Sequence, residues 1–290
     1  MLGILLIHKR AGCTSHDVIR DLRRRLGLKR IGHAGTLDPL ATGLLVVAVG
    51  TATRFLQYLS LEPKEYIAEI QFGAETETYD AEGEPKPIAD PPKNLKTALE
   101  KAIPSFTGLI RQIPPKYSAV KRQGRPLYAY ARAGEDVDPP EREVLIQKIE
   151  VLETTEDTAT LKVAGSTGFY VRSLAHDLGQ ALACGAYLKA LTRTRAGVFE
   201  LRNAVPVEEA GPQHLIPLRN ALEPIPALDL DPAQVEDVRQ GRTLILPETP
   251  NSEELALCDP SGHVFALGRV AGNRVHPECV IPRGPALDHV

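Results

Sequence analysis

Residues 32–45 read Gly32-His-Ala-Gly-Thr-Leu-Asp-Pro-Leu-Ala-Thr-Gly-Leu-Leu45, and this stretch carries the most information about the fold and its chemistry. Pro39 keeps Asp38 out of the helical region and fixes the next φ angle. The surrounding glycines permit tight turns and a close ligand approach. A carboxylate on such a rigid turn suits a nucleophile or a base, because the backbone sets its position. The same Asp-Pro pair also begins ordinary turns and caps helices.

Hydrophobic patterns on either side of this turn predict alternating strands and helices. An apolar strand is expected at 3–7, a helix capped by Thr14 or Ser15 and running to about Gly27, a strand at 44–49 and a helix at 51–59. Residues 64–73 alternate apolar and polar side chains, which is typical of a half-buried strand. The glycine-rich segment from Gly32 to Gly43 is expected to be a loop.

Further along the chain the pattern continues without a strict βαβ repeat. We expect an acidic, proline-rich loop at 74–93, a helix near 94–103, strands at about 143–152 and 158–165, a helix at 171–183 and a strand within 192–201. Residues 111–143 read as an excursion from the core, and the last 50 residues or so as a small β module. This order indicates an α+β fold with a mixed, largely antiparallel sheet flanked by helices.

The charge of the chain is unevenly distributed. The 290 residues have a net charge of −3, yet residues 1–60 carry nine Lys and Arg against three acidic residues. Six basic residues and no acidic one lie between 111 and 134. Such local blocks can neutralise phosphates whatever the total charge, although a solvated surface gives the same pattern.

Several function classes find no support in the sequence. No apolar run approaches the length of a membrane span or a secretory signal, and the four cysteines form no C-x-x-C pair. The glycines match neither the phosphate-binding loop nor the dinucleotide-binding spacing. We therefore expect a cytoplasmic protein with reduced thiols, and these motifs indicate neither a zinc site nor a bound nucleotide.

The segment at 32–45 resembles the catalytic motif of the TruB family, the bacterial tRNA pseudouridine-55 synthases. Further segments resemble the family in order and spacing and cover about residues 3–200. They are Lys9 with 14–17, Lys64–Gly73, Ile113–Lys121, Gly124–Tyr128, Gly168–Arg172 and Leu191–Gly197.

The resemblance implies a pseudouridine-synthase core at 1–225, with an RNA-binding insertion at about 111–143, and a PUA-like RNA-binding module at 226–290. It implies isomerisation of uridine 55 in the T-loop of tRNA after the base is flipped out. This reaction involves no redox change and no net hydrolysis, so we expect neither a metal nor a cofactor. Asp38 would be the catalytic carboxylate, and Arg172 would pair with it. The other implied substrate-binding residues are Tyr66, Tyr170, His33 and Lys9, and the implied RNA-binding residues are Lys116, Lys121, Arg122 and Arg125.

Arg172 falls in the first turn of the expected helix, where the helix dipole disfavours a cation, so a further partner should hold it. The sequence also departs from the family pattern: His8 and Arg10 replace an acidic residue and a proline, Glu65 replaces an arginine and Thr167 a lysine. The changes at 8 and 10 leave those two positions without an implied role, while the changes at 65 and 167 should alter phosphate contacts more than chemistry.

Two other functions compete with the synthase. A non-catalytic RNA-binding or tRNA-folding factor could keep the same scaffold, but it need not retain Asp38, Tyr66 and Arg172 together. A glycosidase would need a second catalytic acid across the bond, and the motifs show none. We expect tRNA, through its T-arm, as the partner of a monomer with no obligate protein partner and no membrane.

Overall fold

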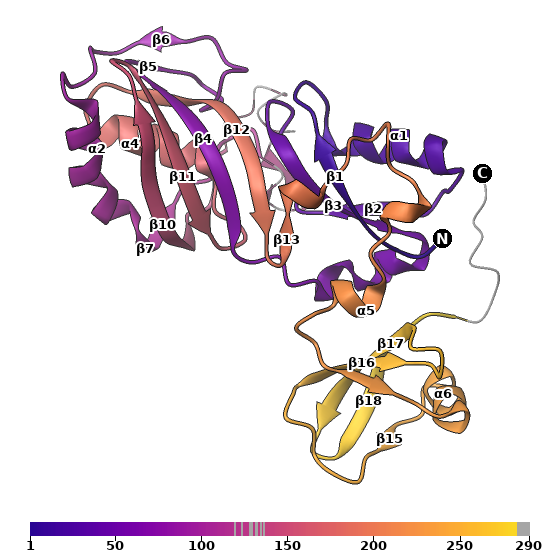
Figure 1. Ribbon diagram of the computed structural model, residues 1–290. Helices are drawn as coiled ribbons and strands as arrows, with labels where there is room; N and C mark the ends of the chain where they lie inside the picture. The colour runs from indigo at the N-terminus through magenta and orange to yellow at the C-terminus, as the bar shows by residue number, and fades with distance from the viewer. Residues whose placement is uncertain are drawn as a thin grey trace.

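A nine-stranded mixed sheet forms the centre of the computed structural model (Figure 1), which describes residues 1–118, 120–122, 124–127, 130, 133, 135 and 137–282, without the side chains of 121 and 126. Its main path runs, in spatial order, through β1 (Gly3–Lys9), β3 (Thr42–Val49), β12 (Ala186–Ala196), β4 (Lys64–Phe72), β11 (Thr158–Gly165), β10 (Arg142–Thr154) and β7 (Gly108–Gln112). Between the described strands of this sheet, every pairing is antiparallel except that of β12 with β3. The expected α+β class with a mixed, largely antiparallel sheet is confirmed.

The burial pattern of each strand follows from what covers its faces. Strand β4 alternates buried and half-buried residues, because one face packs against helices α2 (Leu95–Ala102) and α4 (Val171–Ala181). Strand β1 is buried almost throughout, because Ile4 and Leu6 enter one apolar core while Leu5 and Ile7 enter another on the opposite face. A continuous apolar run is what a strand covered on both faces requires.

Helix α1 (Ser15–Leu26) begins and ends where the sequence predicts. Thr14 and Asp17 form a reciprocal capping box at its start, and Gly27 ends it with a left-handed φ of 64°. Val18, Ile19 and Leu22 are buried against the sheet. The capped helix thereby covers the strands that flank the Asp38 turn.

Three predicted elements differ from the structure, two in their extent and one in its helix type. Ile31–Ala34 forms strand β2, paired with β3, so the loop around Asp38 is limited to 35–41. The expected helix at 51–59 is the 3-10 helix η1 (Gly50–Tyr58). The strand expected within 192–201 is β12, which begins at 186; two register shifts interrupt its period of two and hide its first half in the sequence. The short β13 (Phe199–Glu200) then pairs back onto β12.

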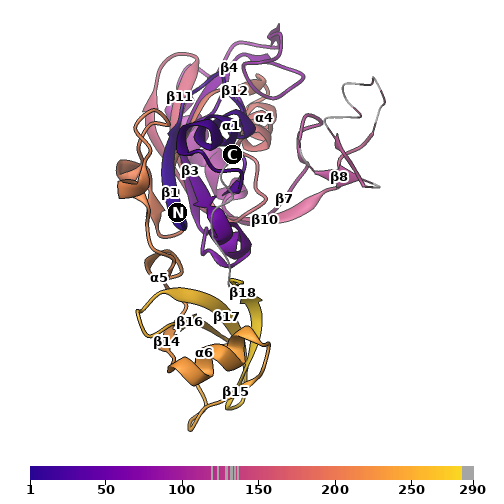
Figure 2. The same ribbon diagram turned by 90° about the vertical axis from the view of Figure 1, so that its right-hand side faces the viewer.

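The chain leaves the sheet after the edge strand β7 and returns to it at the neighbouring strand β10, and residues 113–141 form the insertion between them. Gln112 pairs with Arg142 in the register, so the insertion starts and ends at neighbouring points. Figure 2 shows this insertion, with its hairpin of β8 (Lys121–Arg122) and β9 (Arg125–Pro126), projecting to one side of the sheet. A second connection, after β4, contains the pair β5 (Ala74–Glu75) and β6 (Lys86–Pro87).

A separate five-stranded sheet ends the chain (Figure 1), as expected for a small C-terminal β module. It contains β14 (Ala227–Asp229), β16 (Glu254–Cys258), β17 (Val264–Ala271), β18 (Arg274–Val280) and β15 (Leu244–Ile245), covered by α6 (Pro232–Arg239). Cys258, Val264 and Cys279 share an apolar core with Leu44 and Phe55 of the large sheet and η1. The two sheets are therefore joined by packing as well as by the chain.

The remaining short elements lie in the connections. They are η2 (Ile103–Phe106), η3 (Leu201–Asn203), η4 (Pro212–His214) and α5 (Leu218–Ala221). No helix in the described part of the chain is long and apolar enough to cross a membrane.

Candidate active site

The turn at 35–41 that carries Asp38 is held by side chains from three other elements. The Ser15 hydroxyl, on α1, donates to the Leu37 carbonyl (3.1 Å) and accepts from the Leu37 N–H (2.9 Å). Arg193, on β12, is 1% exposed and donates to the Gly35 carbonyl at 2.8 Å. Gly35 has a φ of +71°, which glycine adopts at little cost. The carboxylate of Asp38 is thus placed by a backbone that is bonded on several sides.

Lys9, on β1, completes the support of this turn. Its side chain is fully buried, and its ammonium donates to the carbonyls of Ala41 (2.6 Å), Pro39 (3.2 Å) and Arg10 (3.1 Å). Burial lowers the pKa of Lys9, and the nearby Asp38 opposes that shift. Lys9 is not among the residues that line the cavity described below. Its substrate-binding role remains a prediction, and its contacts are those of a positioning residue.

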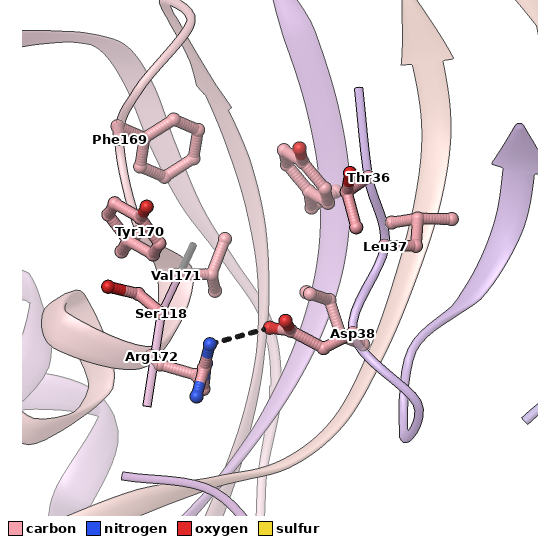
Figure 3. Close-up of a pocket in the computed structure, with 10 residues that line it drawn as sticks. Thr36, Leu37, Asp38, Ser118, Phe169, Tyr170, Val171 and Arg172 are labelled. Carbon is pink, nitrogen blue, oxygen red and sulfur yellow. Dashed lines mark ion pairs between the residues drawn. The ribbon is translucent and has the colours of Figure 1, made fainter. Parts of the chain in front are cut away.

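Asp38 faces Arg172 across the site (Figure 3). Nη2 of Arg172 lies 3.0 Å from Oδ2 of Asp38, and Nη1 lies 3.3 Å from Oδ2 of Asp80. Arg172 is the second residue of α4, and its side chain is 5% exposed. The helix dipole disfavours a cation in this first turn. Asp80, 1% exposed, is therefore the additional partner that the position of Arg172 requires.

Asp80 was not singled out from the sequence. It lies in the loop at 74–93, where its carboxylate accepts from the Thr78 hydroxyl (2.6 Å) and the Glu82 N–H (3.1 Å). The sequence signal is local: an aspartate in a loop typically accepts from the N–H two residues on and so forms a side-chain-bonded turn. That signal fixes the turn but not its partner on α4.

Opposing influences act on the Asp38 carboxyl. Burial raises its pKa most strongly, Arg172 lowers it, and the second carboxylate, Asp80, raises it again; the net direction is upward. The side chain is nevertheless 37% exposed, because it lies at the mouth of a cavity. Asp38 is therefore a carboxylate with more than its ordinary basicity, held by a guanidinium and open to a ligand.

The cavity has a volume of about 140 Å³. It is lined by Thr36, Leu37, Asp38, Tyr66, Ser118, Phe169, Tyr170, Val171, Arg172 and Leu191. Tyr66 and Phe169 meet edge to face, with ring centroids 5.7 Å apart, and burial raises the pKa of the Tyr170 phenol. An engineered cavity of about 150 Å³ binds benzene, so this one has room for a single six-membered ring. Aromatic and aliphatic side chains beside a charged pair suit a planar base.

The structure thus brings together Asp38, Arg172, Tyr66 and Tyr170 and leaves His33 outside the cavity lining. His33 lies on β2 with its ring edge-on to His16 at 5.6 Å, and burial lowers its pKa. Its predicted role, to support a loop after a base has left, is not tested by this arrangement. Phe169 and Leu191 line the cavity but were noticed only as parts of motifs.

The predicted RNA-binding residues lie on the insertion. Arg122 donates to the Asp138 carbonyl, and Arg125 pairs with Glu135 at 2.8 Å and stacks on Tyr130 at 4.3 Å. Lys116 is exposed, while the side chain of Lys121 lies outside the described residues. The two arginines stabilise the insertion internally, and their RNA contacts remain predictions. Within the described residues, no group of three or more His, Cys, Asp or Glu side chains could hold a metal ion.

Comparison with known proteins covers almost the whole chain. Three family models match in sequence: the N-terminal domain of TruB family pseudouridylate synthase at 23–171, the tRNA pseudouridylate synthase B C-terminal domain at 172–224, and the C-terminal domain of tRNA pseudouridine synthase II at 225–282.

Individual relatives agree with the family models. The chain is 39% identical to tRNA pseudouridine synthase B of Azoarcus sp. (strain BH72), over 96% of this chain and 94% of that protein. It is 40% identical to tRNA pseudouridine synthase B of Stutzerimonas stutzeri (strain A1501), over 96% and 95%. Among solved structures, a chain from "Crystal Structure of a Cbf5-Nop10-Gar1 Complex" matches with a TM-score of 0.71 and 26% identity, over 97% of this chain and 85% of that one.

Proposed function

Because this chain belongs to the TruB family of pseudouridine synthases, we propose that it converts uridine 55 in the T-loop of tRNA to pseudouridine, with Asp38 as the catalytic carboxylate and no cofactor. The relatives named as tRNA pseudouridine synthase B match over nearly their full length. The site's geometry supplies the residues for this chemistry.

The reaction moves one bond and leaves the redox state unchanged. The C1′–N1 bond breaks, the uracil turns, C5 joins C1′, and the C5 proton is lost while N1 gains one. Such an isomerisation needs a carboxylate near the sugar, a pocket that retains the free base, and a base for the C5 proton. Asp38 either attacks C1′ or removes the 2′ proton to give a glycal, and both routes use the same ionised carboxylate.

One observation carries the proposal: the Asp38–Arg172 pair opens onto a cavity of about 140 Å³ whose walls include Tyr66 and Leu191. Arg172 opposes the effect of burial and favours the ionised form of Asp38. We assign Tyr66, which lines the cavity, to stacking on the everted uracil, and it is a candidate to relay the C5 proton. The aromatic and aliphatic side chains of the lining would keep the detached uracil beside C1′.

The insertion and the C-terminal sheet are the surfaces we assign to the T-arm. Basic side chains on a segment that projects beside the sheet suit the backbone of a folded RNA. The PUA-like module would add contacts farther along the tRNA. We expect a monomer, because RNA would occupy much of one face, and a cytoplasmic location, because the substrate is tRNA.

The test is to incubate an unmodified T-arm stem-loop with the protein and to map pseudouridine. Asp38→Asn should abolish product while RNA binding stays close to wild type. Asp157→Asn, which alters an exposed carboxylate in the turn between β10 and β11, is the matched control and should retain activity. Product formed by Asp38→Asn at near wild-type rates would refute the mechanism.

The alternative function is a non-catalytic RNA-binding or tRNA-folding factor. It would be favoured if the wild-type protein binds the T-arm tightly and yields no pseudouridine. The cavity beside Asp38 supports the enzyme, since a factor that only folds RNA has no need to enclose a single base.

A further inference from the structure

Gln112, the last residue of β7, is a buried amide that binds both polar backbone atoms of one residue on the cavity wall. Its Oε1 accepts from the Tyr170 N–H at 3.0 Å, and its Nε2 donates to the Tyr170 carbonyl at 3.2 Å. The residue is only 2% exposed. A glutamine amide carries one acceptor and a donor group side by side, so it can pair with an extended peptide as a neighbouring strand would.

Tyr170 is the residue from which α4 starts. It is the N-cap of that helix, it has extended backbone angles, and it supplies no capping bond from its own side chain. Its carbonyl also accepts the first helical bond, from Leu174. The amide of Gln112 therefore fixes the origin of α4 from outside the helix.

Arg172 lies two residues beyond this fixed point. Displacement of the Tyr170 peptide would carry the guanidinium with it, away from Oδ2 of Asp38. We propose that Gln112 is a positioning residue for the reaction: its two hydrogen bonds to Tyr170 set the place of Arg172 and so the alignment of Asp38. This inference rests on the proposed function for its kinetic readout.

The position of Gln112 in the chain adds a link to the RNA-binding insertion. The insertion starts at the next residue, Ile113, whose carbonyl accepts from the Ser173 hydroxyl at 2.7 Å. The Tyr117 carbonyl accepts from Nη2 of Arg172 at 3.0 Å. The root of the insertion and the start of α4 are thus bonded to each other, and Gln112 is the buried member of that junction.

The test replaces Gln112 with methionine, which has a similar size and can form neither bond. The control is Gln71→Met: Gln71 lies on β4 of the same sheet, and its amide donates to Phe72 and Asp157 away from the cavity. Single-turnover pseudouridine formation on bound T-arm should fall about 10- to 100-fold in Gln112→Met. The RNA dissociation constant should change less than about threefold, and Gln71→Met should keep the wild-type rate.

The pH profile separates positioning from simple loss of stability. Arg172 lowers the pKa of Asp38, so an Arg172 that has moved away should shift the acid limb of the rate to higher pH. In a variant that is only less stable, the rate divided by the folded fraction, which circular dichroism measures at each pH, would keep the acid limb of the wild-type protein. An unchanged acid limb, or a rate equal to that of Gln71→Met, would overturn the proposal.

Two further measurements keep the outcome decisive. If Gln112→Met does not fold, Gln112→Glu replaces it. A protonated carboxyl at this position can form both bonds to Tyr170 and an ionised one cannot, so the rate of Gln112→Glu should fall with rising pH. A pH–rate profile equal to that of the wild-type protein would overturn the proposal. Titration of the Asp38 carboxyl by carbon NMR reads the alignment without activity. An Asp38 pKa that rises in Gln112→Met supports the positioning role even if the proposed function fails, and one that does not rise refutes it.

Discussion

Removal of the Arg172 charge should cost far more stability than removal of either carboxylate that binds it. Arg172→Met leaves Asp80 at 1% exposure with only a hydroxyl and an N–H as partners. Breaking a buried ion pair from one side costs about 3–5 kcal/mol, because the remaining charge has lost both water and its partner. We expect the unfolding free energy of Arg172→Met to fall by that amount.

The two carboxylate variants should lose less unfolding free energy than Arg172→Met, and Asp80→Asn should lose more than Asp38→Asn. In Asp80→Asn, Arg172 keeps Asp38 and the carbonyls of Thr78 and Tyr117, so the loss should be about 2 kcal/mol, the value of one charged hydrogen bond. In Asp38→Asn the side chain that loses its charge is 37% exposed, and burial already disfavours that charge. The unfolding free energy should therefore change by no more than about 1 kcal/mol.

Urea unfolding at neutral pH, followed by circular dichroism, measures these differences as shifts of the midpoint at constant slope. Arg195→Met is the matched control, because Arg195 lies on the same sheet but pairs with Glu65 while 42% exposed. The double variant Arg172→Met/Asp80→Asn should be more stable than Arg172→Met alone, since Asp80 no longer brings an unpaired buried charge. An Arg172→Met midpoint equal to that of Arg195→Met would refute the reasoning.

Three other predictions address the turn, a buried carboxyl and the insertion. Lys9→Met should lower the single-turnover rate about tenfold with little change in T-arm affinity, because the Lys9 ammonium binds carbonyls of the turn at 35–41 and does not line the cavity. A variant that loses only T-arm affinity would restore Lys9 as a substrate-binding residue. Burial raises the pKa of Asp177 to about 6, so the folded state binds an extra proton between about pH 4 and 6 and loses stability as pH rises through that window. Asp177→Asn should therefore raise the urea midpoint above about pH 6 and leave it unchanged below about pH 4. The same gain in midpoint at both pH values would contradict this. Changing Lys121, Arg122 and Arg125 together to alanine should weaken T-arm binding. The slope of log binding constant against log salt concentration should become less steep by nearly one for each phosphate that is no longer neutralised. An unaltered slope would remove the insertion from the RNA interface.

The elements that sequence patterns predict well are those whose signals are local. The strand at 64–72 follows from its alternation, and α1 from the capping box of Thr14 with Asp17 and from Gly27. The turn around Asp38 follows from a proline that restricts its backbone and from glycines that permit left-handed backbone angles. In each case the residues that give the signal are also those that form the structure.

The parts that escaped prediction depend on interactions between distant segments. Asp80 reaches Arg172 because residues 79–81 pair with Leu188 of β12, through the bonds of Leu188 N–H to the Tyr79 carbonyl and of Ala81 N–H to the Leu188 carbonyl. Nothing in an acidic loop specifies that pairing. The role proposed for Gln112 is equally hard to predict from the sequence, because it depends on hydrogen bonds to Tyr170, which lies 58 residues away.

The sharing of one guanidinium between two carboxylates explains how Asp38 can be both ionised and reactive. A bidentate arginine engaged with Asp38 alone would hold it ionised but would also make it a weak base and nucleophile, since hydrogen bonds to a carboxylate stabilise that form. Asp80 occupies Nη1, so Asp38 receives only Nη2, and the second negative charge raises the pKa of Asp38 further. Asp80 is itself too deeply buried to meet a substrate. Its charge therefore balances the cation at the start of α4, and it leaves the half-buried Asp38 with a raised pKa, which suits the catalytic role that we propose for it.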